Sequence, residues 1–261
     1  LHDQGVPMEA KPFSMGVRIE HLQKDLDTAQ YGKQTAQLPP ADYKLAVHLD
    51  DGQSAYTFCM CPGGYVVASA SEVGGVVTNG MSYEARQGKN ANSALLVTLH
   101  PKDFPYEGPL GGMVWQRELE QRAFAYGGGD YTAPAQLVKD FLADRPSTKL
   151  GTVEPTYAPA VKLGDLRQVL PAQITDVMVK ALPLLSNKLA VFSKGDGVMT
   201  APETRSSSPI RILRDETSQS QIRGLYPCGE GAGYAGGITS AAIDGIKIAE
   251  VILVKSASKN L

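Results

Sequence analysis

The feature that most constrains this chain is a glycine-rich stretch near its end. Residues 229–237 read GEGAGYAGG and contain the spacing G-x-G-x-x-G. In a dinucleotide-binding unit this spacing follows a strand, opens a helix and precedes a second strand, with an acidic residue about 20 positions further on. The short, mostly apolar residues 224–228 predict the first strand, and the helical spacing in 239–253 predicts the helix. The tail SASKNL (256–261) cannot form a second buried strand, so the βαβ interpretation fails.

The glycine loop has two remaining interpretations. Glycines let backbone N–H groups approach a ligand closely, and the helix that follows adds about half a positive charge at its N-terminus. A phosphate, or a ligand that accumulates negative charge, binds well at such a place. The alternative is a tight turn whose glycines allow a helix to pack on a sheet. The local pattern leaves both interpretations open.

Composition excludes several classes of protein. The 261 residues are 43% hydrophobic and 20% charged, which is typical of a soluble globular protein. A net charge of −2 and the absence of a Lys/Arg stripe argue against nucleic-acid and anionic-membrane partners. No apolar run reaches the roughly 18–20 residues of a spanning helix. Three cysteines are too few for a disulfide framework, so we expect a cytoplasmic protein. Because the N-terminus lacks Met and resembles the middle of a protein, we expect the chain to be part of a longer one.

Periodicity predicts a sheet in the first part of the chain and helices in the middle. The predicted strands are 13–20, 43–49, 54–60, 65–69, 75–78, 93–99 and 209–213, and those between 43 and 99 are expected to form one antiparallel sheet. The predicted helices are 110–126, 133–142 and one or two within 165–189. Residues 22–42 are polar and are expected to form a crossing segment, and 200–209 a polar loop.

A few residues outside the glycine loop are able to carry chemistry. On a strand, Cys59 and Cys61 would point to one face, where they line a substrate site, serve the structure, or take part in redox or metal chemistry. A tetrahedral zinc site needs four ligands, and the sequence offers no second pair, so we predict no metal site. Arg18, Glu20 and His21 are either a solvated strand end or, for the first two, one strand face at a ligand. None of the four histidines is in a pattern typical of a general base.

Several stretches together resemble one group of flavoproteins. They are GLYPCGEGAGYAGGI (224–238), SAAIDGI (240–246), KPFSMGVRIEH (11–21), QYG (30–32), TFCMCPGG (57–64), TNGMS (78–82), NSA (92–94) and TAPETRSSSP (200–209). The first two resemble the C-terminal flavin motif of two-dinucleotide-fold flavoproteins. The whole set, in order over nearly the entire chain, resembles the largely uncharacterised bacterial FAD-dependent dehydrogenases, which are NAD(P)/FAD-dependent oxidoreductases.

The resemblance implies a mixed α/β (α+β) fold class. Residues 14–199 would be an inserted middle domain, with an antiparallel sheet and helices, that shapes the substrate site. Residues 1–13 and 200–261 would be the remnant of an FAD/NAD(P)-binding fold, ending in strand, glycine loop and helix. The half that carries the true dinucleotide fingerprint would be a missing N-terminal partner segment. The chain alone would therefore bind FAD weakly or not at all.

The resemblance also implies FAD as the cofactor, with NAD(P)H as a further candidate cofactor, and it implies which residues approach FAD. The residues expected at the isoalloxazine ring are Gly229, Glu230, Gly231, Ala232, Gly233, Tyr234, Ala235, Gly236, Gly237 and Ile238. The helix dipole would stabilise negative charge near N1 and O2 of the reduced ring. Arg205 and Ser206 would contact a phosphate or the ring edge, and Glu230 would cap the helix or bind a ribitol hydroxyl. Arg18, Cys59 and Cys61 are the candidates for catalysis.

Three functions follow as hypotheses. The first is an enzyme: the C-terminal part of an FAD-dependent oxidoreductase acting on a small-molecule substrate. The second is a non-catalytic module that binds a ligand or partner, in which the flavin-type tail only completes the fold. The third, a flavin-dependent modifier of tRNA, is disfavoured by the near-neutral charge.

Overall fold

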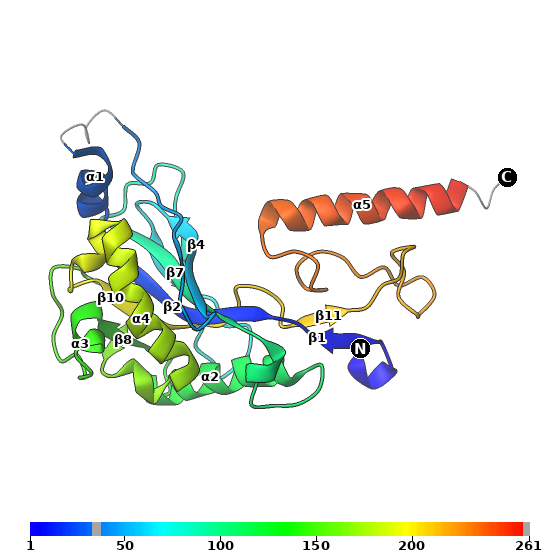
Figure 1. Ribbon diagram of the computed structural model, residues 1–261, viewed down its shortest axis with the longest axis horizontal. Coiled ribbons are helices and arrows are strands. Elements are labelled where there is room, and N and C mark those ends of the chain that lie inside the picture. Colours follow the sequence, from blue (N-terminus) through cyan, green and yellow to red (C-terminus); the bar gives the residue numbers. More distant parts are fainter. Residues whose placement is uncertain (33–37, 258–261) are drawn as a thin grey trace. The chain divides into compact units, whose positions relative to one another are not determined.

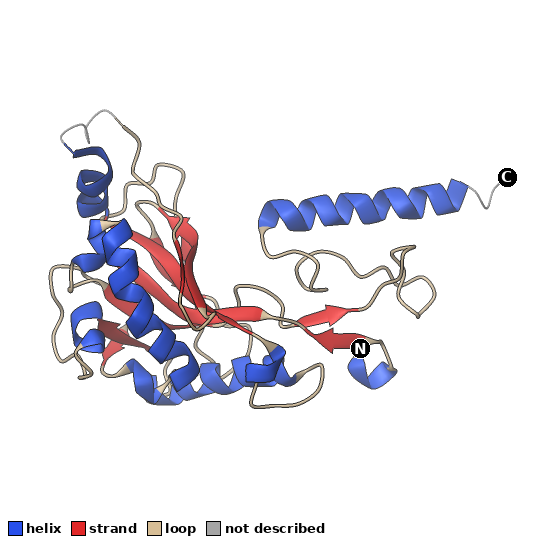
Figure 2. Ribbon diagram, in the orientation of Figure 1, coloured by secondary structure: helices blue, strands red, loops and turns tan. Residues whose placement is uncertain are grey.

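The structure is a computed structural model that describes residues 1–32 and 38–257. It divides into two compact units, one of residues 1–14, 99–116 and 205–261, and one of residues 15–98 and 117–204. We call them unit 1 and unit 2. The described residues form five α-helices, one seven-stranded mixed sheet and two small sheets, so the predicted mixed α/β class is confirmed (Figures 1 and 2). The domain boundaries predicted at 14 and 199 stay a prediction.

The seven-stranded sheet is the framework of unit 2. Its strands, in spatial order, are β3 (Ala46–His48), β4 (Ser54–Cys61), β7 (Asn90–Leu99), β2 (Phe13–Leu22), β10 (Val198–Glu203), β8 (Ala133–Leu137) and β9 (Val161–Leu163). The pairs β3/β4, β4/β7, β2/β10 and β10/β8 are antiparallel, whereas β8 and β9 are parallel. Strands β2, β7, β8 and β10 are buried along most or all of their length, so the core runs through the centre of the sheet.

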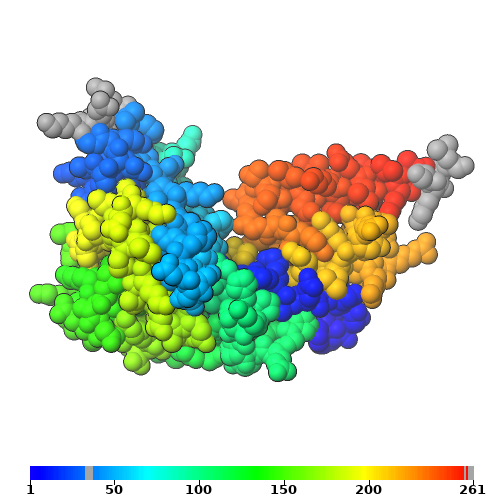
Figure 3. Space-filling model, viewed as in Figure 1, coloured from blue at the N-terminus to red at the C-terminus, as the bar shows by residue number. Residues whose placement is uncertain are grey.

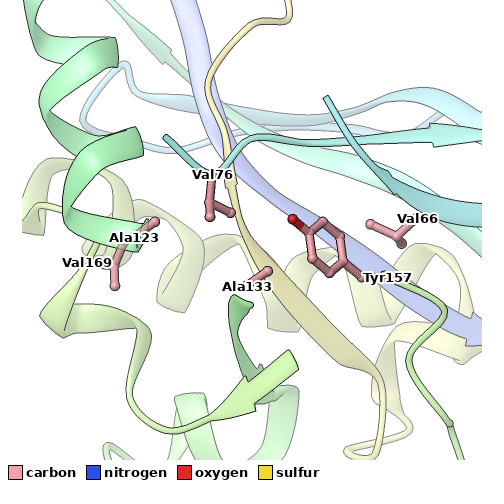
Figure 4. Close-up of a cluster of buried hydrophobic side chains, with 6 residues drawn as sticks. All are labelled: Val66, Val76, Ala123, Ala133, Tyr157 and Val169. Carbon is pink, nitrogen blue, oxygen red and sulfur yellow. The ribbon is translucent and has the colours of Figure 1, made fainter. Parts of the chain in front are cut away.

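Three helices belong wholly to unit 2: α1 (Gln23–Tyr31), α3 (Val138–Leu142) and α4 (Ala172–Lys188). Helix α4, labelled in Figure 1, begins directly after its N-cap Pro171 and contacts β3 and β4. Its buried residues recur at helical spacing: Ile174, Thr175, Val177, Met178, Ala181, Leu182 and Leu185. A further apolar cluster, drawn in Figure 4, joins Val66, Val76, Ala123, Ala133, Tyr157 and Val169.

Unit 1 holds the glycine loop. Strand β1 (Met8–Ala10) pairs antiparallel with β11 (Ile210–Ile212), and the loop leads from there into α5 (Ile238–Ala257). Figure 3 shows the side chains of α5, in orange and red, at the surface of the molecule. Helix α2 (Gly111–Gly127) begins in unit 1 and ends in unit 2. No helix in the described residues has both the length and the apolar character needed to cross a membrane.

Five sequence predictions need correction. Residues 200–203, expected to lie in a polar loop, belong to the buried strand β10. Residues 133–137 are strand β8, not helix, because pairing with both β10 and β9 and complete burial outweigh local helical spacing. Residues 224–228 form no strand, since no described strand pairs with them. The segment 22–42, expected to cross the fold without a helix, contains α1. Residues 33–37 of this segment and residues 258–261 of the tail lie outside the described residues. Strands β5 (Tyr65–Ala68) and β6 (Thr78–Met81) form a separate two-stranded sheet.

Candidate functional site

The glycine loop is a compact turn held by its own backbone. The N–H of Gly233 donates to the carbonyl of Glu230 (2.9 Å), and that of Tyr234 to the carbonyl of Gly229 (3.0 Å). Strand β11 fixes the loop from outside, because the N–H of Ile212 donates to the carbonyl of Ala232 (3.1 Å). The backbone of the loop is thus positioned before α5 begins.

Two of the glycines are required by the turn itself. Gly229 and Gly233 have φ of 73° and 87°, in the left-handed region that L side chains rarely adopt. A Cβ on Gly233 would also lie 2.3 Å from the carbonyl oxygen of Ile210 and 2.8 Å from the Cα of Arg211. Gly233 therefore serves the close approach of the loop to β11, which is the packing role that the sequence left open.

Two other glycines have no such reason. Gly231 and Gly236 are exposed, do not have a left-handed φ, and a Cβ on either would meet nothing within 4 Å. Both leave open space beside the loop, and Gly236 lies two residues before the N-terminus of α5 at Ile238. A helix N-terminus presents free N–H groups and partial positive charge, so this space suits an electron-rich or anionic group.

An ion pair that was not predicted from the sequence restrains the loop. Asp244 of α5 accepts from the N–H of Gly229 (2.8 Å) and from both terminal nitrogens of Arg214 (3.0 and 2.8 Å). The Arg214 guanidinium lies 3.6 Å from the centre of the Tyr234 ring. Hydrogen bonds from Arg214 hold the pKa of Asp244 below its usual range. The one signal in the sequence is an acidic residue, Asp244, within the mostly apolar stretch 238–254.

The structure places Arg205 and Ser206 in unit 1 with the loop. The hydroxyl of Ser206 donates to the carbonyl of Ser14 (2.7 Å), and Arg205 is exposed. It is Ser208 that reaches the loop, through its hydroxyl and the carbonyl of Gly231 (3.2 Å). Whether these side chains contact a ligand stays a prediction.

A second group of predicted residues gathers in unit 2 around Arg18. Its guanidinium is fully buried, and each of its five N–H groups has an acceptor. The acceptors are both carboxylate oxygens of Glu203 (2.8 and 2.7 Å), the carbonyl of Cys59 (2.8 Å), Asn79 Oδ1 (3.0 Å) and Asn92 Oδ1 (3.3 Å). Gly80 is needed here, because a Cβ would lie 2.6 Å from Arg18 Nη1.

The interpretation of residues 18–21 as a solvated strand end is therefore wrong. Arg18, Glu20 and His21 are all buried, because β2 is the central strand of the sheet. Burial alone would lower the pKa of Arg18, but the charge and hydrogen bonds of Glu203 outweigh it and raise that pKa. A short run of polar residues at a strand end does not indicate that the hydrogen-bond acceptors of Arg18 come from distant strands.

Glu20 and His21 occupy different environments. Burial raises the pKa of Glu20, although its carboxylate accepts from the hydroxyl of Thr156 (2.6 Å) and from Asn90 Nδ2 (3.0 Å). The ring nitrogens of His21 have no hydrogen-bond partner among the described residues, and the ring packs on Phe192 with centroids 4.8 Å apart. Burial lowers the pKa of His21 to about 4. His21 is thus a neutral core residue.

Cys59 and Cys61 are close together but differ in exposure. Cys59 is exposed and Cys61 is buried. The pairing of β4 with β7 is irregular between Phe58 and Cys61, and the expectation that both thiols lie on one strand face stays a prediction. The thiol of Cys61 donates to the carbonyl of Cys59 (3.3 Å). No group of three or more His, Cys, Asp or Glu residues in the described part of the chain is arranged to hold a metal ion.

Unit 2 also contains a cavity of about 450 Å³. Its lining includes the polar residues Lys89, Asn90 and Thr156 beside Tyr65 and Leu22. Two of these, Asn90 and Thr156, hydrogen-bond the buried carboxylate of Glu20. The volume lies within the range of small-molecule sites, and the polar groups at the wall are fixed from behind.

Residues 12–206 match the family model described as "FAD-dependent protein, C-terminal domain-like". This range includes Arg18, Cys59 and Cys61 but ends before the glycine loop. The chain is 48% identical over 259 residues to a protein of Clostridium beijerinckii (strain ATCC 51743 / NCIMB 8052) that carries the name "Uncharacterized protein". The match covers 98% of this chain and 49% of that relative, so the chain spans about half its length.

Proposed function

The chain belongs to the FAD-dependent protein C-terminal domain-like family, and from that premise we propose that it is the C-terminal part of an FAD-dependent dehydrogenase. In this proposal residues 229–238 contact the flavin ring. The rest of the cofactor is held by another segment of a longer protein. The match with the relative covers about half of that relative's length. Unit 2 shapes the site of a small-molecule substrate, and NAD(P)H is a candidate hydride donor or acceptor.

The observation that carries the proposal is the open space beside Gly231 and Gly236. Neither glycine is required by a positive φ or by a close neighbour in the chain, so the small size of these residues is free to admit another molecule. Gly233 and the Asp244–Arg214 pair hold the loop in one shape without entering that space. The site therefore fits a flat, electron-rich ring.

The protein residues have a definite task at this site. Bound flavin supplies two-electron transfer as a hydride equivalent. The chain supplies backbone N–H groups and the positive end of α5, which stabilise a negatively charged ring more than a neutral one. Because that charge is present only after reduction, this end of the helix favours the reduced state. Asp244 restrains the loop through the N–H of Gly229, so the donors need little reorganisation.

The experiment uses the complete polypeptide, with wild type compared with Gly236→Val. We expect the wild type to bind FAD, and its flavin bands to bleach with NAD(P)H in the absence of oxygen. Gly236→Val should lower flavin affinity at least tenfold while leaving the unfolding midpoint of the apoprotein unchanged, since the added side chain enters open space. Gly245→Ala is the control, because Gly245 also has open space but lies two turns into α5. Equal flavin affinity of Gly236→Val and wild type would contradict the proposal.

The cavity favours a second candidate function, a non-catalytic ligand-binding module. Its fixed polar wall needs no flavin to bind a small molecule. The two functions separate in the same experiment. A complete polypeptide that stays colourless after incubation with FAD, and yet binds small polar molecules in a thermal-shift screen, would favour the module.

A further inference from the structure

The two cysteines of unit 2 are brought together by a bulge in β4. Phe58 pairs with Ala94, and Cys61 pairs with Asn92, so three steps along β4 face two steps along β7. Cys59, inside this irregularity, has φ of 46°, which is unusual for a residue with a side chain. Residues two apart in a regular strand are separated by about 6.7 Å, near the upper limit for a disulfide. The bulge bends the strand at this point, and Cys61 Sγ lies 3.3 Å from the carbonyl oxygen of Cys59.

Cys59 and Cys61 have different surroundings. Cys59 is exposed, whereas Cys61 is buried with its thiol directed to the carbonyl of Cys59. The Arg18 guanidinium donates to that same carbonyl at 2.8 Å, so a fixed, buried positive charge stands beside Cys59. The amide Nδ2 of Asn92, which is opposite Cys61, is fully buried and has no partner among the described residues.

The charges facing the pair act on the two thiols in opposite directions. The hydrogen bond from Cys61, and then the charge of Arg18, lower the pKa of Cys59 to about 6 although burial opposes the shift. The hydrogen bond to Cys59, and then burial, raise the pKa of Cys61. Glu203 balances the charge of Arg18 from the far side of the guanidinium. At neutral pH one accessible thiolate thus lies beside one thiol.

We propose that Cys59 and Cys61 form a dithiol site that exchanges with low-molecular-weight disulfides, Cys59 attacking and Cys61 resolving. The inference is independent of the proposed flavin function, since it rests on unit 2 alone. In the first step the Cys59 thiolate attacks one sulfur of the disulfide. A bond forms between Cys59 Sγ and that sulfur, the disulfide bond breaks, and the other sulfur leaves as a thiolate.

The second step closes the protein disulfide. Once Cys59 is in the mixed disulfide, its negative charge no longer opposes ionisation of Cys61. The proton of Cys61 passes to the thiolate that has left, and Cys61 Sγ attacks Cys59 Sγ and releases the second thiolate. Two electrons have passed from the two protein sulfurs to the substrate disulfide, which becomes two thiols when the last thiolate takes a proton from water.

The first test needs no substitution. The whole chain is alkylated with iodoacetamide over a pH series, and peptide mass spectrometry follows Cys59 and the exposed Cys228 separately. We expect the rate at Cys59 to be half-maximal near pH 6. At that pH Cys59 should react about tenfold faster than an ordinary exposed thiol, even after allowance for the weaker nucleophilicity of a low-pKa thiolate. A half-maximal rate at Cys59 near pH 8.5 or above would overturn the inference.

The second test separates attack from resolution, in a Cys228→Ser background and with oxidised glutathione as the probe. The protein with both Cys59 and Cys61 should end as an internal disulfide without bound glutathione. Cys61→Ser should stop at a stable mixed disulfide on Cys59, and Cys59→Ser should not react at the rate of the parent. A mixed disulfide that persists with Cys61 present would overturn the resolving role. Equal reaction rates of Cys59→Ser and the parent would overturn the attacking role.

Discussion

At the scale of single residues, the guanidinium of Arg18 joins five strands of the protein. Its acceptors lie on β4, β6, β7 and β10, while Arg18 itself is on β2. A fully buried charge is tolerated only when it is paired and its donors are satisfied, and both conditions hold here. Removing one partner leaves the other charge buried without compensation, which costs far more than the intact pair contributes.

Glu203→Gln is therefore expected to lower the free energy of unfolding by about 3–5 kcal/mol. Its matched control is Asp51→Asn, which removes the carboxylate of an exposed pair with Lys180 and should change stability little. Urea unfolding followed by circular dichroism measures both. Similar losses of unfolding free energy in the two variants would contradict a larger contribution of the buried Arg18–Glu203 pair to stability.

The buried imidazole of His21 makes the stability of the protein depend on pH. His21 in the unfolded chain takes up a proton below about pH 6.5, whereas the folded protein takes it up only below about pH 4. Stability is therefore lost as the pH falls through this window, by about 3 kcal/mol from this one group. His21→Phe should reduce the pH slope of the unfolding free energy by nearly one proton between pH 4 and 6.5. An unchanged slope would contradict the assignment of His21 as a neutral core residue.

At the scale of elements, the glycine loop and α5 act as one piece. Gly233 fits against β11, and Asp244 joins the helix to the start of the loop. Gly233→Ala should lower the free energy of unfolding of unit 1 by about 2 kcal/mol or more, because it combines a left-handed φ with a backbone clash. Gly231→Ala is the control and should be close to neutral. Hydrogen exchange of the amides in 229–234 measures the local effect, and equal protection in both variants would contradict it.

The elements also show what the sequence is able to predict. Strands β2, β4 and β7 and helices α2 and α4 follow their periodicity closely, since each buries one face or a long apolar run. Helix α5 also forms where its spacing predicts it, although most of its side chains are exposed. Strand β8 does not, because burial among β10 and β9 is a property of the fold and not of its five residues. In the same way the sequence gives the loop and both cysteines as candidates. The Arg18 acceptors and the Arg214–Asp244 brace come from distant segments, and only the fold brings them together.

At the scale of the whole molecule, α5 exposes an apolar surface larger than scattered single residues would give. Ile238, Ile246, Leu253 and Val254 are 91%, 61%, 69% and 67% exposed. The chain matches only about half of its Clostridium beijerinckii relative, so we propose that another segment of the longer protein covers this surface.

This proposal predicts that the chain alone binds a hydrophobic dye such as ANS, and that the complete polypeptide binds much less. Ile246→Glu should reduce dye binding by the chain alone. Val73→Glu is the control, because Val73 of unit 2 is 94% exposed but lies outside α5. Equal dye fluorescence of the chain and the complete polypeptide would contradict coverage of α5.

Contact between the glycine loop and the flavin ring is measured most directly by hydrogen exchange of the complete polypeptide with and without FAD, read on the peptide that spans residues 229–241. The loop amides and the first turn of α5 are the proposed donors to the flavin ring, so FAD should slow their exchange. If FAD binds, as its absorbance shows, and exchange in this peptide stays the same, the ring lies elsewhere and the proposed contact is wrong.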